Sequence, residues 1–316
     1  MPAEVLTLGE SMVVFVPEAA GPLRHAERFS RGVAGAESNL AIGLCRLGHP
    51  AAWIGRLGDD EFGRLIWSTL RGEGVDLTHA ALDGRGPTGV MFKERSAGGD
   101  SRVFYYRRCS AASLLDAGYI AAEPFATARW LHLTGITPAL GAAPRRAVGR
   151  ALELARQHGL RVSFDPNFRA RLWSPAEARP VLLGLLSGAD VGMLSEAEGE
   201  LLFGAGSPEA MAAAALATGC GLVAVKLGER GALLARGQER WLVPPHAVAA
   251  VEPTGAGDAF AAGLIAGLLE GLPPEAAGRM GAVCGALVCA VASDWEGAPE
   301  REAMRRALGG ATNWLR

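Results

Sequence analysis

With 316 residues, nearly half of them apolar, the chain is long enough for one large α/β domain or two smaller ones with a sizeable core. A formal net charge of −2 without any run of basic residues excludes a polyanion-binding surface, so we expect no nucleic-acid partner. The N-terminus lacks a signal-peptide pattern, and no uninterrupted apolar run is long enough to span a bilayer. We therefore expect a soluble, cytoplasmic protein with no membrane partner.

The cysteines and histidines indicate neither disulfides nor zinc. Five cysteines form no CxxC pair, and an odd count is typical of a reducing compartment. The six histidines are scattered, so a zinc site is not expected. Basic residues are almost all arginine, and only Lys93 and Lys226 are lysine.

The first ninety residues alternate between short apolar runs and helical patterns. A buried strand is predicted at 5–8, and apolar alternation resumes at 12–16 before Pro17 ends it. A helix follows residue 39 and ends at Gly48, as a C-cap would. A strand at 51–54 and a helix at 61–71 come next.

Residues 88–108 are rich in β-forming side chains. Two strand-like runs, at 90–94 and 102–107, flank a glycine-containing turn at 96–100 and predict a hairpin. Because helical stretches surround it, we expect this insert to pair with 12–16 and with the segment near 23–30. Together these segments predict a small, discontinuous β-lid over approximately 11–32 and 88–108.

From residue 130 onwards, strands and helices alternate regularly. This alternation predicts a mainly parallel sheet covered by helices on both faces, with ligands beyond the carboxyl ends of its strands. Asp165 to Arg169 and Ser195 to Glu198 follow two such strands. The predicted strands are 130–133, 161–164, 190–194, 222–226, 232–235 and 241–243, and the predicted helices are 143–158, 175–186 and 208–218.

The sequence Gly255-Ala256-Gly257-Asp258 precedes an apolar, alanine-rich run that predicts a helix to about residue 269. Glycines allow close backbone approach, and a helix start presents unpaired N–H groups, so the turn is suited to hold an anion. A carboxylate there makes sense if it faces the hydroxyl that receives a phosphate. The alternative is that Asp258 only caps the helix.

Several common enzyme motifs are missing from the sequence. There is no GxxxxGK[ST] loop of the P-loop NTPases and no GxSxG elbow of the α/β-hydrolases. The GxG at Gly255 comes late in the chain and has Phe260 at its sixth position, which argues against an NAD-binding fingerprint.

Three separated elements together resemble the ribokinase-like (PfkB) family of carbohydrate kinases along essentially the whole chain. The resemblance implies a single domain, 1–316, with a mainly parallel central sheet, helices on both faces, a β-lid, and a nucleotide-binding half at approximately 190–316. It also implies ATP and Mg²⁺ as cofactors. The elements are residues 35–39 with 46–48 and 55–60, then 225–231, and then 252–258.

The resemblance assigns roles to the polar residues of these elements. Asp258 would be the catalytic base, and the amides of Gly255, Ala256 and Gly257 would stabilise developing negative charge. Ser195 would lie at the nucleotide, in place of the family's asparagine, and Glu198 would bind Mg²⁺ through water. Lys226 and Gly228 would contact nucleotide phosphates. The alternatives are an exposed helix face for Glu198 and an ordinary strand-end lysine for Lys226.

Within that family the sequence is similar to the 2-keto-3-deoxygluconate kinases, which implies an acidic sugar as substrate and a product for Entner–Doudoroff-type catabolism. The similarity is carried by residues 103–107, 131–140, 165–169 and 296–299. Two arginines would hold the carboxylate, since guanidinium forks match carboxylates. Met91 stands where these kinases have a second tyrosine. The implied sugar-binding residues are Gly35, Asn39, Met91, Tyr105, Arg107, Arg169 and Asp258.

Other functions remain open at this point. Surface salt bridges could account for Arg107 and Arg169, in which case a fructokinase or another neutral-sugar kinase fits. A non-catalytic sugar-binding regulator on the same fold is a rival from another class, and a purely structural subunit leaves Asp258 without a purpose. The small sheet also predicts a homo-oligomer formed through the lid, and lid closure on sugar binding.

Overall fold

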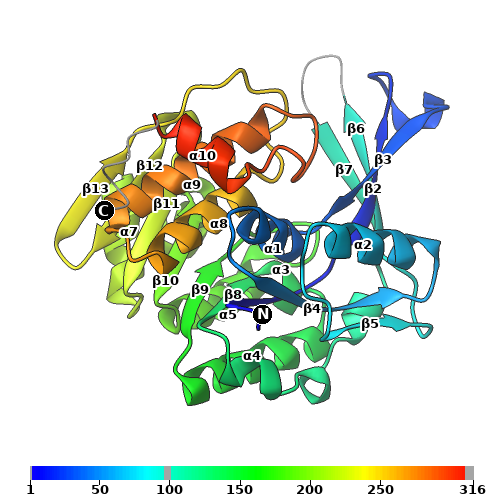
Figure 1. Ribbon diagram of the computed structural model, residues 1–316, viewed down its shortest axis with the longest axis horizontal. Coiled ribbons are helices and arrows are strands. Elements are labelled where there is room, and N and C mark those ends of the chain that lie inside the picture. The colour runs from blue at the N-terminus through cyan, green and yellow to red at the C-terminus, as the bar shows by residue number, and fades with distance from the viewer. Residues whose placement is uncertain (1, 96–100, 310–316) are drawn as a thin grey trace.

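The computed structural model describes residues 2–95 and 101–309, arranged as a large sheet between helices with a smaller sheet at one side (Figure 1). The expected hairpin turn at 96–100 lies outside the described residues. No helix in the described ranges is long and apolar enough to cross a membrane.

The large sheet has nine strands in the order β13-β12-β11-β10-β9-β8-β1-β4-β5. All pairings are parallel except those of β12 with β11 and with β13, so the predicted mainly parallel sheet is confirmed. The strands are β1 (Val5–Leu8), β4 (Ala51–Gly58), β5 (Ala80–Asp83), β8 (Trp130–Thr134), β9 (Arg161–Asp165), β10 (Val191–Ser195), β11 (Leu222–Lys226), β12 (Ala232–Arg236) and β13 (Glu239–Val243).

Helices cover both faces of this sheet because its central strands are apolar on both sides. Met193 packs into one buried cluster and its neighbour Leu194 into the other. The first cluster is completed by α1 (Ala36–Arg46), α2 (Glu61–Gly72), α8 (Ala256–Leu269), α9 (Pro274–Cys289) and α10 (Arg301–Ala307). The second is completed by α4 (Ala142–His158), α5 (Pro175–Ser187), α6 (Glu196–Phe203) and α7 (Pro208–Ala217). The short α3 (Ile136–Ala139) precedes α4.

The four-stranded lid projects from the large sheet in the order β3-β2-β6-β7 (Figure 1). Its strands are β2 (Met12–Pro17), β3 (Phe29–Ala34), β6 (Val90–Arg95) and β7 (Ser101–Tyr106). The strands β2 and β6 pair in parallel, and the other pairs are antiparallel. Since β2 follows directly after the end of β1, the lid stands at the carboxyl edge of the large sheet, where a ligand is expected.

One local expectation was wrong, and one strand was not predicted. The partner of β2 is 29–34 rather than the segment near 23–30, where Leu23–His25 instead form a single 3₁₀ turn. That turn follows Gly21 and Pro22, and Pro22 fixes the local backbone torsion and has no N–H to donate to a ladder. The edge strand β5 was not predicted, because its four residues are half-exposed and too few to show a periodic pattern.

Candidate active site

The turn before α8 is shaped by a glycine that cannot be replaced. Gly255 has a φ of +81°, and a Cβ there would lie 1.8 Å from the carbonyl oxygen of Asp294. Of the amides at 255–258, only that of Ala256 donates to a backbone carbonyl among the described residues, that of Pro253 at 3.2 Å. The other amides of the turn are therefore free to bind an anion.

Asp258 lies in the first turn of α8, half-buried, and is oriented from outside the helix. The Nδ2 of Asn39 donates to one carboxylate oxygen at 2.8 Å, and the Nδ2 of Asn167 approaches the other at 3.5 Å. Burial, supported by the nearby charge of Asp165, raises the pKa of Asp258 to about 7 against the opposing effect of the Asn39 hydrogen bond. A carboxylate with that pKa can gain and lose a proton near neutrality.

Lys226, at the end of β11, joins the strand ends to the turn. Its Nζ donates to the carboxylate of Asp165 at 2.5 Å and lies 3.4 Å from the position of a Cβ on Gly257. Burial alone would lower the pKa of Lys226, but the negative charges of Asp165, Glu198 and Asp258 raise it above its ordinary value. The lysine is thus a fixed positive charge beside the amides of the turn.

Ser195 and Glu198 form a capping box at the start of α6. The Glu198 carboxylate accepts from the amide and the hydroxyl of Ser195, both at 2.8 Å, and from the amide of Phe168 at 2.9 Å. Its charge also acts on Lys226, so it belongs to the same site. The serine that stands in place of the family's asparagine therefore serves as a helix cap.

Gly228 opens the 3₁₀ turn Gly228–Arg230 directly after β11. Its φ is +59°, and no heavy atom lies within 4 Å of where its Cβ would be. The backbone is consequently accessible from outside at this position, next to Lys226.

On the lid, Met91 and Tyr105 are paired across β6 and β7 and share one face. Met91 is buried against Met12, Val14 and Ala34, and Tyr105 packs at the edge of that cluster. The thioether and the phenol are thus neighbours on one face of the lid.

Arg107 follows β7 and is buried, with its guanidinium 5.4 Å from the centre of the Tyr105 ring. Its Nε donates at 2.7 Å to Glu10, a carboxylate that also accepts from Ser110. A simple surface salt bridge is therefore wrong for Arg107, because both partners of its ion pair are buried.

Arg169 and Gly35 lie in different environments. Arg169 is exposed after β9, and its positive charge reaches Asp258. Gly35 precedes α1, and a Cβ there would lie 2.5 Å from the carbonyl oxygen of Glu10. The contact that requires glycine at position 35 is thus one to the protein's own backbone.

Four polar residues of this region were not among the predicted site residues: Glu10, Glu37, Asp165 and Asn167. Glu37 accepts from Thr134 and Thr137, its second oxygen has no partner among the described residues, and burial raises its pKa. The position of Asp165 and Asn167 directly after a predicted strand was an available signal. Glu37 lies within the element 35–39, but its partners Thr134 and Thr137 are 97 and 100 residues away. Glu10 gave no signal, since its partner Arg107 is 97 residues away.

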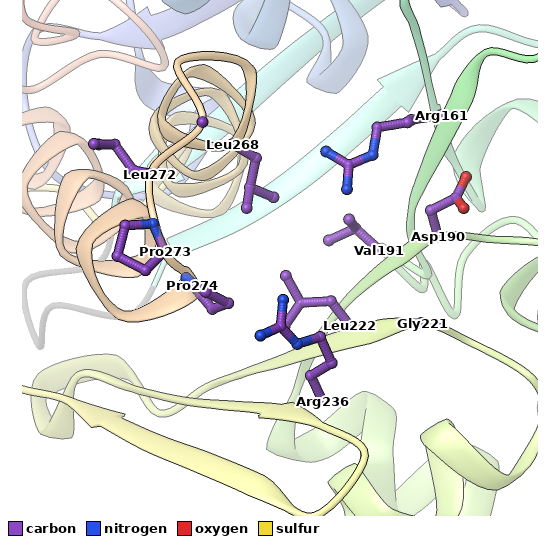
Figure 2. Close-up of a pocket in the computed structure, with 11 residues that line it drawn as sticks. Arg161, Asp190, Val191, Gly221, Leu222, Arg236, Leu268, Leu272, Pro273 and Pro274 are labelled. Carbon is purple, nitrogen blue, oxygen red and sulfur yellow. The ribbon is translucent and has the colours of Figure 1, made fainter.

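A cavity of about 470 Å³ lies at the opposite edge of the large sheet and holds none of these groups (Figure 2). It is lined by Arg161 and Val191, which begin their strands, and by the loop between α8 and α9. In parallel sheets ligands bind at the carboxyl ends of the strands, so the site around Asp258 is the candidate active site.

No group of three or more His, Cys, Asp or Glu side chains in the described ranges is arranged to hold a metal ion. Glu198 retains lone pairs beyond the three donors that it accepts, and Mg²⁺ needs few protein ligands because it keeps several waters. The residues therefore fit a water-mediated Mg²⁺ and do not form an all-protein cage.

The chain thus combines a mainly parallel sheet covered on both faces, a separate four-stranded lid and an amide-lined turn beside a carboxylate. Residues 2–301 match the model of the pfkB family carbohydrate kinases. The chain belongs to that family.

Three relatives illustrate the range of similarity. The chain is 39% identical to a 2-dehydro-3-deoxygluconokinase of Bacillus subtilis, over 98% of this chain and 96% of the relative. It is 35% identical to a fructokinase of Klebsiella pneumoniae, over 98% of this chain and 100% of the relative. A structure of a putative ribokinase II from E. coli in complex with ATP and Mg²⁺ is 28% identical, with a TM-score of 0.90 over 97% of this chain and 99% of that chain.

Proposed function

We propose that this sugar kinase transfers the γ-phosphoryl group of ATP to the terminal C6 hydroxyl of 2-keto-3-deoxygluconate. The observation that carries the chemistry is the half-buried Asp258, oriented by Asn39 beside the amides of residues 255, 257 and 258, for which no backbone acceptor is found among the described residues. The substrate assignment is supported by two arginines, one after a lid strand and one after β9, and by the similarity to 2-dehydro-3-deoxygluconokinase, which is another name for the same activity.

In this mechanism Asp258 accepts the proton of the attacking hydroxyl. The hydrogen bond from Asn39 fixes one carboxylate oxygen at 2.8 Å, and the other oxygen, which Asn167 approaches only at 3.5 Å, would face the substrate. Because phosphoryl transfer has a loose transition state, the proton leaves late and a weak base is sufficient. The pKa of about 7 keeps a large fraction of Asp258 ionised at neutral pH.

The backbone of the turn and two charged side chains serve the phosphates. The amides of Gly255, Gly257 and Asp258 stabilise the charge of the transferred group, and Lys226 neutralises part of it. Glu198 would hold a water of a bound Mg²⁺, which would screen the charge of the nucleotide. Gly228 offers its open backbone to the nucleotide, and we assign the half of the chain after about residue 190 to nucleotide binding.

The two arginines would contribute differently to binding the carboxylate of the sugar. Arg169 is exposed and close enough to act on Asp258, so we assign it as the principal carboxylate ligand. Arg107 shares its Nε with Glu10 and would contribute its remaining N–H groups. Tyr105 would hydrogen-bond the sugar from the lid, and Met91 would pack against its carbon face.

Fructokinase activity is the alternative that a specific finding favours, because a fructokinase matches over the whole chain. The ion pair between Arg107 and Glu10 also leaves that part of the site close to neutral. A silent sugar-binding regulator is a further alternative, against which the intact turn at 255–258 argues.

The test is ADP release with ATP and Mg²⁺ across 2-keto-3-deoxygluconate, its galactonate epimer, fructose, ribose and gluconate, with Asp258→Asn as the blank. Turnover restricted to the keto-deoxy acids supports the proposal. Turnover on fructose or ribose alone refutes the substrate while leaving Asp258 its role. No turnover on any sugar, with binding detected by calorimetry, would favour the regulator.

We further propose a cytoplasmic homo-oligomer formed through the lid, acting in Entner–Doudoroff-type catabolism. The support is an aromatic cluster on the face of the lid opposite Met91, in which Phe15 stacks on Phe92 at 5.2 Å. Tyr106, at the edge of this cluster, is 68% exposed. A single protomer's mass in light scattering would contradict the assembly.

A further inference from the structure

Both lysines of the chain form part-buried or buried ion pairs beside the turn at 255–258, and one of them comes from the lid. Basic residues are otherwise all arginine, so surface charge is supplied without lysine. Lys226 pairs with Asp165. Lys93, in the lid strand β6, pairs with Asp294, and the side chains of both are about 95% buried. The second pair has no place in the mechanism described so far.

Asp294 contacts the catalytic turn through its backbone. Its carbonyl oxygen occupies the space that a Cβ on Gly255 would need, so Asp294 and Gly255 are in direct contact. The residues before each partner are also joined to each other. The amides of Val251 and Glu252, just before Gly255, donate to the carbonyl of Cys289, just before Asp294, at 2.7 and 3.1 Å. A shift of Asp294 must therefore move Gly255 or break this packing.

The segment around Asp294 is also attached to the lid at a second point. The indole Nε1 of Trp295 donates to the carbonyl of Val33 in β3 at 3.0 Å. Residues 294 and 295 thus contact two different lid strands, one through a charge and one through a hydrogen bond. This segment bridges the lid to the phosphate-binding turn.

The lid end of the bridge lies on the sugar-facing side. Alternation along β6 places Lys93 on the same face as Met91, whose cross-strand partner is Tyr105. A sugar that contacts Met91 and Tyr105 therefore acts on the strand that carries Lys93. No other acceptor for the Lys93 ammonium is found in the described ranges.

The charge on Asp294 depends on Lys93. Burial raises the pKa of Asp294, and the lysine opposes this shift, while Glu252 and Glu296 add to it. Without the ammonium, Asp294 would be a buried carboxylate facing two further carboxylates, an arrangement that is strongly unfavourable. The segment would then relax by moving or by taking up a proton.

We propose that Lys93 and Asp294 are positioning residues that couple occupation of the sugar site to the geometry of the Gly255 turn. Sugar binding fixes β6, the ion pair transmits this to Asp294, and the Asp294 carbonyl holds Gly255 in the conformation that directs its amide to the phosphate. Neither residue touches the reacting atoms. The proposal rests on the sugar-kinase activity of the chain and does not depend on which sugar is the substrate.

The test compares Lys93→Met, Lys93→Arg and Asp294→Asn with Glu270→Gln. Glu270 is a matched control because it is a largely buried carboxylate paired with Arg301 at the opposite end of α8. Kinetics are measured with whichever sugar of the panel wild-type protein phosphorylates, so failure of the proposed substrate stays separate. We expect Lys93→Met and Asp294→Asn to lower kcat about 10- to 100-fold with KM for the sugar changed less than about threefold, and Lys93→Arg to recover most of the loss.

Hydrogen exchange provides the readout that a purely structural pair would not change. In wild-type protein and in Glu270→Gln, the sugar alone should slow exchange both in β6 and at 251–258. In Lys93→Met the protection of β6 should persist, and that at 251–258 should be lost. Protection of both segments in Lys93→Met, or a kcat within about threefold of wild type, would overturn the proposal. If Lys93→Met does not fold, Asp294→Asn, which keeps an acceptor for the lysine, decides by the same criteria.

Discussion

The edge of the large sheet and the lid hold their polar groups in different ways. At the sheet edge, Asp258 is half-buried, has one close donor in Asn39, and lies beside three amides that donate to no backbone carbonyl in the part of the chain that the structure describes. In the lid, Arg107 and Lys93 are already paired with buried carboxylates. The first region is open to a ligand, while in the second the charges are neutralised before any ligand arrives.

This difference separates catalysis from recognition. The groups proposed to bind phosphate are largely backbone N–H groups, which no substitution removes as long as the turn keeps its glycines. The groups proposed for recognition are side chains with partners of their own, so that changing one leaves the other buried and unpaired. Substitutions in the lid should therefore affect stability and substrate choice together.

The largest effect is expected at the sheet edge. Asp258→Asn keeps the shape of the side chain but removes the base, and kcat should fall about a thousandfold. Steady-state ADP release measures the loss, and a circular dichroism spectrum identical to wild type serves as its control. A decrease of less than about tenfold would remove Asp258 from the role of base.

In the sugar site, Arg169→Met should raise KM for the acidic sugar about 10- to 100-fold and leave KM for ATP unchanged, because an exposed carboxylate ligand is lost. The double variant Glu10→Gln/Arg107→Met removes the buried pair without leaving a lone charge. It should raise the same KM less, since Arg107 offers only part of its guanidinium. Equal turnover of the acid by both variants and wild type would refute the arginine assignment.

The pH dependence follows from Asp258. Its pKa is raised to about 7, and the base must be ionised to accept a proton. We expect kcat/KM to rise about tenfold between pH 6 and pH 8, since this ratio reports groups of the free enzyme. A kcat/KM that does not change between pH 6 and pH 8 would contradict this expectation.

A raised carboxyl pKa also means that this group's contribution to stability falls as pH rises from its ordinary value of 3.8 to about 7. Asp258→Asn should accordingly melt higher than wild type at pH 8. Equal melting temperatures of the two proteins at pH 8 would contradict this statement.

A smaller effect is expected in the lid at Met91. Met91→Tyr and Met91→Phe differ by one hydroxyl. The ratio of their KM values for the acidic sugar therefore isolates the effect of the phenol hydroxyl that related kinases have. We expect KM for the acidic sugar to be about two- to tenfold lower in the tyrosine variant, which is the worth of one hydrogen bond. Identical KM values would place position 91 away from the sugar hydroxyls.

The smallest effect is a change in stability. Ser195→Ala removes the capping box of α6 and should cost about 1 kcal/mol, which corresponds to a decrease in Tm of about 2 °C. Ser195→Asn should restore the Tm, because asparagine also caps helices. A rise in KM for ATP in Ser195→Ala at a temperature well below its Tm would assign Ser195 to the nucleotide as well.

The sequence predicted the large sheet well because its strands are short apolar runs separated by capped helices. The two runs at 90–94 and 102–107 also predicted the hairpin of β6 and β7, while its register, with Met91 opposite Tyr105, came from the structure. The position of β3 did not follow, because residues 29–34 include a glycine and an arginine and show weak alternation. Edge strands such as β5 give too few residues for any period to appear.

The residues alone indicated the site only where its chemistry lies within one motif, and the family resemblance added distant residues such as Asn39 and Lys226. Asp258 and its amides are consecutive, so one short stretch indicated them. The partner of Arg107 could not be predicted, since Glu10 is 97 residues away and no periodicity connects them. The capping box of Ser195 and Glu198 was available as an S-x-x-E pattern, which shows that a residue assigned to a cofactor can also have a local structural role.

The scarcity of lysine has a practical consequence. An amine-reactive reagent meets only two side-chain targets, Lys93 and Lys226, and each is paired with a carboxylate in a different part of the site. Mass spectrometry of the acylated peptides then reports two events separately in the unmodified protein. If the proposed roles hold, the rate of labelling at Lys93 would follow opening of the lid, and the rate at Lys226 would follow release of the nucleotide.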